Sequence, residues 1–145
     1  MSHQPIEQLD VFALFEEIAT WAWQAVQSWD HFAQRTIGEQ LVRAIDSVNA
    51  NLVEGDGRYT TNDSLRFFVI SRGSAREARL WIERAERRKL VESGQSTAML
   101  SKLDRAIRLL NLLIEYRRRA QKAGTVREER TVYGAEPLQG IAEGN

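Results

Sequence analysis

Residues 49–79 read NANLVEGDGRYTTNDSLRFFVISRGSAREAR, and this stretch decides the fold because it joins two helical patterns through a short glycine-rich turn. Gly55-Asp56-Gly57-Arg58 lies at the turn. A left-handed glycine commonly ends a helix, so Gly55 is predicted to stop the first of the two helices. Thr60 and Asp63 resemble a capping box with Asp in the position of Glu, which predicts that the next helix begins near residue 61.

The two glycines of this turn also raise the question of a phosphate site. A P-loop has the pattern GxxxxGK[ST] between a strand and a helix, and a dinucleotide fingerprint has a third glycine within a βαβ unit. Here the glycines follow a helix and have no lysine partner. We therefore interpret Gly55 and Gly57 as a helix stop and a tight turn. The alternative is that Arg58 and the N–H groups at the start of the next helix attract an anion.

The composition favours an all-α chain of one domain. The 145 residues can bury a core, and the two prolines lie near the ends, at positions 5 and 137. Alanine, leucine, glutamate and arginine dominate, and runs of alternating β-branched residues are missing. Apolar stripes predict an antiparallel up-down-up-down four-helix bundle over residues 1–119, with helices at about 10–28, 35–54, 61–88 and 96–119. Residues 120–145 lack a sustained stripe and are predicted to form an extended or mobile tail.

Polar residues around the turn predict a structural network. Arg43, Ser47, Asn51 and Glu54 lie at three- and four-residue steps and so share a face of the second helix. Asn51 and Glu54 are expected to hold the backbone of the turn and Arg58, and Glu77 is expected to meet Arg43. Such a network fixes register more than it adds stability. The alternative is that these clustered polar residues mark a binding site.

Gly73 lies inside the third predicted helix, where glycine costs about 1 kcal/mol relative to alanine. We expect close approach of a neighbouring backbone to offset that cost. Aromatic residues outside the apolar stripe of the first helix, namely Phe12 and either Trp21 or Trp23, predict contact with another subunit. The alternative is that one tryptophan seals the edge of the bundle.

Several function classes are disfavoured by the residue types. The chain has no cysteine and only two histidines, which argues against thiol catalysis, zinc sites and histidine triads. Adjacent carboxylates such as Glu16-Glu17 point apart on a helix, and the Glu-x-x-His pattern of di-iron bundles is absent. No signal peptide or membrane span is recognisable. We therefore predict a soluble, cytoplasmic, non-enzymatic protein without metal or cofactor.

The charge distribution is uneven although the net charge is zero. Residues 1–64 carry ten acidic and three basic side chains, and residues 65–145 carry ten acidic and 17 basic ones. Pairing of the two halves within or between subunits explains this, and a nucleic-acid surface is the alternative. Two basic clusters end the third and fourth helices and are candidate RNA or DNA contacts, although cations there also favour the helix dipole: Arg84, Arg87, Arg88 and Lys89, and Arg117, Arg118, Arg119 and Lys122.

The ordered polar and glycine positions resemble the four-helix bundle protein family, also called the 23S ribosomal RNA intervening-sequence proteins. The resemblance covers roughly residues 10–119. It rests on Gln40-Leu41-x-Arg43-Ala44, on Ser47-Val48-x-Ala50-Asn51, on Glu54-Gly55-x-Gly57-Arg58, on Phe67-Phe68 and on Gly73-Ser74-x-x-Glu77. The chain departs from the family pattern in residues 28–34, which lack proline, and in its longer tail.

The resemblance implies a small cytosolic bacterial protein with an antiparallel four-helix bundle that forms a ring-like homopentamer. The chain is also distantly similar to the accessory proteins of diversity-generating retroelements. Those proteins are pentameric barrels that bind nucleic acid and a reverse transcriptase. No enzymatic activity comes with the resemblance. It therefore favours a self-assembling module, with a nucleic-acid-binding accessory protein as the alternative.

Overall fold

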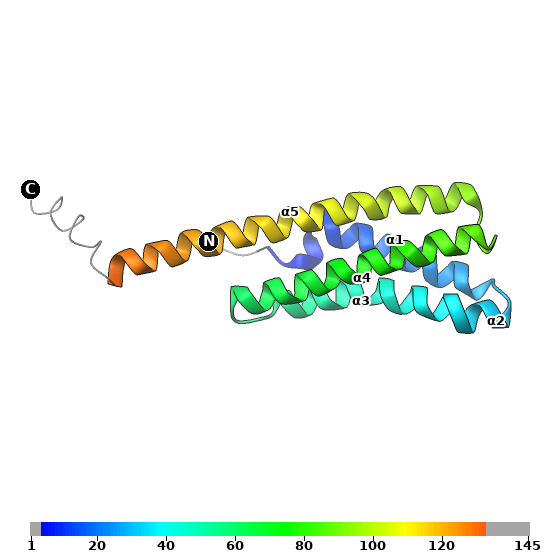
Figure 1. The fold of residues 1–145 in the computed structure, drawn as a ribbon, viewed down its shortest axis with the longest axis horizontal. Coiled ribbons are helices and arrows are strands. Elements are labelled where there is room, and N and C mark those ends of the chain that lie inside the picture. The colour runs from blue at the N-terminus through cyan, green and yellow to red at the C-terminus, as the bar shows by residue number, and fades with distance from the viewer. Residues whose placement is uncertain (1–3, 133–145) are drawn as a thin grey trace, which may run out of the picture.

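The structure is a computed structural model that describes residues 4–132, with side chains described through Gly124. This part of the chain contains helices and no strand, which confirms the prediction of an all-α four-helix bundle (Figure 1). The four long helices are α1 (Asp10–Gln27), α3 (Glu39–Asp56), α4 (Thr61–Arg87) and α5 (Ser93–Val132). Shorter elements are η1 (Ile6–Gln8) before α1, and α2 (His31–Ala33) and η2 (Gln34–Gly38) between α1 and α3.

The apolar stripes of the four long helices face one shared core. Every predicted stripe position of the second helix is buried, so that stripe is confirmed. The largest fully buried side chains come from all four long helices and from η1. They are Ile6, Phe15, Ile18, Leu41, Ile45, Val48, Leu52, Phe68, Ile82, Leu103, Leu110 and Ile114.

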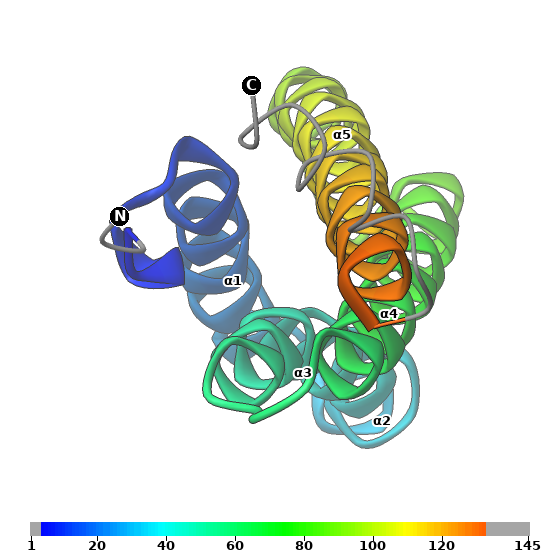
Figure 2. The ribbon, with the colours of Figure 1, turned by 90° about the vertical axis from the view of Figure 1, so that its left-hand side faces the viewer.

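Hydrogen bonds between neighbouring helices fix their register. Ser64 and Ser71 of α4 donate through Oγ to the carbonyls of Gly55 and Val48 of α3, at 2.6 and 2.7 Å, and both bonds are buried. The next pair, α4 and α5, is joined by Gln121 with Asn62, Arg72 with Asn111, and Arg79 with Asp104. Viewed end on, the four long helices follow one another around the core in the order α1, α3, α4 and α5 (Figure 2).

Helical structure begins earlier than predicted on the amino-terminal side of α3. The predicted start near residue 35 is wrong, because the chain is already helical at His31. Asp30 lies in extended backbone and its carboxylate accepts a hydrogen bond from the N–H of Ala33, at 3.0 Å. That bond caps α2, and the wider π-helical turn η2 then leads directly into α3. The segment without proline that departs from the family pattern is therefore a capped helical entry.

The end of α3 also differs from the prediction. Gly55 lies inside α3, which continues to Asp56, and Gly57 is the C-cap with φ −85°. The expectation of a left-handed stop at Gly55 is therefore wrong. A Cβ on Gly55 would lie 2.8 Å from Cβ of Phe67 and 3.0 Å from Cε1 of Phe68, so glycine is needed because α4 packs against α3 at this point. The predicted start of α4 is confirmed, since Thr60 accepts from the N–H of Asp63 at 3.2 Å.

The expectation that Gly73 allows close backbone approach is wrong within this chain. Apart from Gly73, its two chain neighbours and the adjacent backbone of α4, no atom of the described residues lies within 4 Å of the place where a Cβ on Gly73 would stand. Gly73 is exposed, because α4 buries Ser71 and Ala75 on its inner face and turns Gly73 outward. The helix-propensity cost of this glycine is therefore not offset by packing within one chain.

Replacing Gly73 by alanine is expected to raise the free energy of unfolding by about 1 kcal/mol, because the methyl group meets open space and alanine favours the helix. Urea denaturation of the two proteins at equal concentration measures the difference. A loss of stability would contradict the open surroundings of Gly73.

The ends of α4 and α5 complete the bundle. Lys89 has φ 60°, and the N–H groups of Lys89 and Leu90 donate to the carbonyls of Glu86 and Ala85, which is the Schellman arrangement that ends a helix. α5 then begins at Ser93 and runs to Val132 (Figure 1). The predicted end at 119 and the extended tail are therefore wrong for residues 120–132. Alanine, arginine, lysine and glutamate continue the helix without needing an apolar stripe. Residues 133–145 of the predicted tail lie outside the described residues.

Candidate functional site

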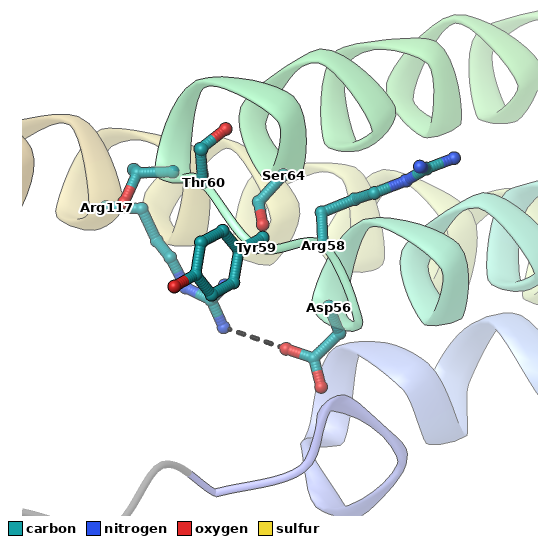
Figure 3. A pocket seen from close by; sticks show the side chains of 7 residues that line it. Asp56, Arg58, Tyr59, Thr60, Ser64 and Arg117 are labelled. Carbon is teal, nitrogen blue, oxygen red and sulfur yellow. Dashed lines mark hydrogen bonds and ion pairs between the residues drawn. The ribbon is translucent and has the colours of Figure 1, made fainter.

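A pocket of about 280 Å³ lies where the α3–α4 turn meets α5. The carboxyl end of α3 supplies Asp56, the turn supplies Arg58, Tyr59 and Thr60, the first turns of α4 supply Thr61 and Ser64, and α5 supplies Arg117 (Figure 3). The sequence singled out this turn, but it contained no sign that a residue 61 positions after Asp56 would complete the pocket.

Asp56 and Arg117 form the central ion pair of the pocket. Arg117 Nη2 lies 3.2 Å from Asp56 Oδ1, and the two side chains are only 12% and 17% exposed. Asp56 Oδ2 also accepts from the N–H of Ile6 at 3.1 Å, and the Arg117 guanidinium lies 5.0 Å from the centre of the Phe68 ring. One carboxylate therefore ties the α3–α4 turn to both α5 and η1. Arg117 was predicted as a nucleic-acid contact, and this geometry gives it a structural role.

Arg58 points away from that ion pair (Figure 3). Its guanidinium lies 2.7 Å from Glu54 Oε1 and 4.6 Å from the centre of the Phe67 ring. The expected pairing of Glu54 with Arg58 is confirmed. Both arginines of the pocket therefore already face carboxylates, which reduces the attraction of the turn for an anion.

Two hydroxyl groups of the pocket form hydrogen bonds with the backbone. Thr60 caps α4, and buried Ser64 donates to the carbonyl of Gly55 at 2.6 Å. Tyr59 is fully exposed beside them. The Thr60 and Ser64 hydroxyl groups of the pocket therefore hold the turn in place, and Tyr59 is its exposed aromatic group.

The other expected contacts of the polar network do not form. Arg43 pairs with Glu39 at 2.7 Å, one turn away in α3, and Glu77 accepts from Nε1 of Trp81 at 3.0 Å, one turn away in α4. The predicted meeting of Glu77 and Arg43 is therefore wrong. Asn51 donates to the carbonyl of Ser47 at 2.7 Å, so the prediction that it holds the turn is also wrong. In each case the partner lies four residues away in the same helix.

Asn49 is a buried polar residue that sequence reasoning missed. Its Nδ2 donates to the carbonyl of Phe12 at 3.0 Å and to Glu16 Oε2 at 3.1 Å, which joins α3 to α1. Nearby, burial and then the charge of Glu16 raise the pKa of the Asp46 carboxyl above its ordinary value. The only local signal is that Asn49 directly follows the buried stripe residue Val48. Helical spacing cannot reveal the bond itself, because its partners lie in a different helix.

A second polar group joins α4 to α5. Arg79 holds both oxygens of Asp104, at 2.7 and 3.2 Å, and lies 3.0 Å from Glu83. The hydrogen bond to Asp104 contributes most to raising the pKa of Arg79 above its ordinary value, so the guanidinium stays charged. This bidentate geometry fixes the register of the two helices.

The two basic clusters lie at different places. Arg84, Arg87, Arg88 and Lys89 are at the carboxyl end of α4, and Arg117, Arg118, Arg119 and Lys122 lie along α5 beside the start of α4. Arg84 stacks over the Trp81 ring at 5.1 Å, and Arg119 pairs with Glu115 at 3.1 Å. Within the described residues, no group of three or more acidic, histidine or cysteine side chains could hold a metal ion. None of the helices among residues 4–132 has the length and apolar character needed to cross a bilayer.

Comparison with known proteins places this geometry in a family. The family model described as 23S rRNA-intervening sequence protein matches residues 7–112, which include α1, α3, α4 and the first half of α5. A crystal structure of a protein of unknown function from the S23 ribosomal protein family of Bacteroides thetaiotaomicron is similar in fold, with a TM-score of 0.64. The two chains are 19% identical, over 72% of this chain and 97% of the other. No curated protein matches the chain.

Proposed function

Because this chain belongs to the 23S rRNA-intervening sequence protein family, we propose that it is a non-enzymatic cytoplasmic module that assembles with copies of itself. In this proposal the bundle is antiparallel, with up-down-up-down topology, and the copies assemble into a ring. The observation that carries it is the exposure of large apolar side chains on the outer faces of three helices: Trp23 on α1, Ile70 and Leu80 on α4, and Leu112 and Tyr116 on α5.

Trp23 supports the proposal most directly. It lies on α1 away from the core and is 59% exposed, whereas the neighbouring Trp21 is half-buried. A tryptophan that only sealed the edge of the bundle would be largely covered by its own chain. Aromatic side chains that stay exposed in one chain are typical anchors of contacts between chains.

The mass in solution tests the proposal. Size-exclusion chromatography with light scattering is expected to give a multiple of the 16.6 kDa chain mass, with five copies as the number that the resemblance implies. Trp23→Ala is expected to lower that mass and to leave the circular dichroism spectrum unchanged, since Trp23 packs little within the chain. A wild-type monomer at micromolar concentration would contradict self-assembly.

Nucleic-acid binding is the second candidate, and a different observation favours it. Arg105, Arg108, Leu112, Tyr116 and Arg119 are all exposed at three- and four-residue steps, so they form one row along α5. Arginines with an aromatic group between them suit a single strand, because cations attract phosphates and a base stacks on the ring. This row has a better arrangement for such contact than the predicted cluster at the end of α4.

Fluorescence anisotropy with a labelled single-stranded RNA tests this candidate. Tyr116→Ala is expected to weaken binding by about 10-fold, since stacking of one base contributes about 1–3 kcal/mol. Arg87→Ala at the end of α4 is the matched control and should have a smaller effect. Binding whose affinity does not fall with added salt would count against contact with phosphates.

A further inference from the structure

Two grooves lie on different sides of α5, and the first is basic. It has a volume of about 530 Å³ and lies between α4 and α5. Its apolar part comes from Leu65, Val69 and Ile70, and its charged part comes from Arg66, Arg118 and Lys122. Among the residues whose side chains the structure describes, none that lines this groove is acidic. We refer to it as the basic groove.

The second groove is acidic. It has a volume of about 490 Å³ and lies between α1 and α5. Glu16 and Glu17 supply its charge, and Trp21 and Met99 supply its apolar part. Its described lining includes neither lysine nor arginine. We refer to it as the acidic groove.

The acidic groove is held in shape by contacts within the chain. Glu16 accepts from buried Asn49, and Glu17 pairs with Lys102 while its side chain stays 48% exposed. Nε1 of Trp21 is buried and has no hydrogen-bond partner among the described residues. The groove therefore presents two positioned carboxylates, one of them paired with Lys102, beside the half-buried side chain of Trp21.

We propose that the two grooves are the two halves of one contact between copies of this chain. In this contact α1 of one copy lies against the basic groove of the next, and Arg118 and Lys122 of that next copy face Glu16 and Glu17 of the first. The inference rests on the proposed self-assembly and specifies which surfaces it uses. Both grooves combine apolar side chains with charge, and their charges are opposite, so each surface matches the other.

The charge distribution of the whole chain favours a second copy over other occupants. The net charges of −7 for residues 1–64 and +7 for residues 65–145 sum to zero in every copy. An anionic polymer would match only the basic groove, and a cationic peptide would match only the acidic one. A second copy matches both.

The position of the grooves sets the type of assembly. The grooves lie on different faces, since one adjoins α4 and the other adjoins α1, and Figure 2 shows these two helices on different sides of α5. A contact between two different faces is heterologous, and it repeats from copy to copy until a ring closes.

Complementary charge reversal tests this contact. One variant carries Arg118→Glu and Lys122→Glu, and the other carries Glu17→Lys and Gln24→Lys, since Gln24 also lines the acidic groove. Each variant alone places like charges opposite each other, so its dissociation constant is expected to rise about 10- to 100-fold. A chain that carries both reversals is expected to recover assembly, because every contact then pairs opposite charges again whatever the number of copies in the ring. Arg87→Glu with Arg88→Glu changes the net charge by as much as the first variant does and is the control, since both residues lie outside the grooves.

Light scattering and circular dichroism distinguish the outcomes. If the wild type assembles, both variants stay folded and dissociate, and the chain with both reversals assembles, the contact is supported. A wild type that assembles together with variants that assemble equally well would overturn the contact and leave self-assembly standing. Loss of assembly in each variant without recovery in the folded chain that carries both reversals would also overturn it. A monomeric wild type would overturn self-assembly itself.

Discussion

Replacing Asp56 by alanine is expected to lower the free energy of unfolding by about 3 kcal/mol. Removal of one partner from a largely buried ion pair leaves the other charge poorly compensated, which costs about 3–5 kcal/mol when burial is complete. The Asp56 and Arg117 side chains are 12% and 17% exposed, so the lower end of that range applies. The variant also loses the hydrogen bond from the N–H of Ile6, so η1 is expected to loosen from the bundle.

Glu54→Ala is the matched control for this loss. Glu54 pairs with Arg58 only two residues from Asp56, but these side chains are 56% and 41% exposed. An exposed pair contributes about 0–1 kcal/mol, because water solvates both charges when the pair is broken. Urea denaturation at one fixed protein concentration compares the variants without a change in assembly. An equal fall in the free energy of unfolding for Asp56→Ala and Glu54→Ala would show that the buried Asp56–Arg117 pair stabilises the fold no more than the exposed pair does.

The sequence predicted the helices well because their apolar stripes are local patterns. Leu41, Ile45, Val48 and Leu52 recur at three- and four-residue steps, and all are buried. The cap at Thr60 is equally local, since donor and acceptor are three residues apart. The partner of Asp56 is 61 residues away in the chain, and no spacing rule links such positions.

Local contacts also explain the errors in the predicted network. Arg43 and Glu77 each have a partner four residues away in their own helix, where side chains at this spacing are neighbours. The loss of an apolar stripe after residue 119 was interpreted as a tail. A helix continues, however, wherever residue propensity favours it, and Gln121 still bonds to Asn62 of α4 at 2.6 Å.

The two glycines show what a single sequence leaves open. Gly55 and Gly73 both lie in helices, and either one could permit close packing. Which of the two glycines permits close packing depends on which face of each helix contacts a neighbouring helix. Gly55 faces α4 and is buried, whereas Gly73 faces outward, so the close contact predicted for Gly73 occurs at Gly55 instead.

Replacing Gly55 by valine is expected to lower the free energy of unfolding by about 3 kcal/mol. A Cβ at this position would lie 2.8 Å from Cβ of Phe67, an atom fixed to the α4 backbone, so the two helices must separate. Overpacking of a core costs about 1–3 kcal/mol, and the branched side chain of valine places its effect at the upper end. Separation also strains the buried hydrogen bond from Ser64 to the Gly55 carbonyl, which is 2.6 Å long.

Two alanine variants separate this steric effect from helix propensity. Alanine favours a helix over glycine by about 1 kcal/mol, and Gly73→Ala is expected to show that gain. At Gly55 the same methyl group meets Phe67 and Phe68, so Gly55→Ala is expected to destabilise by about 1 kcal/mol despite the better propensity. Opposite signs in urea denaturation would place the close contact of α3 and α4 at Gly55. A gain in stability for both alanine variants would mean that α4 can move away from α3 at little cost, and the buried serine bonds between the two helices would then not fix their register.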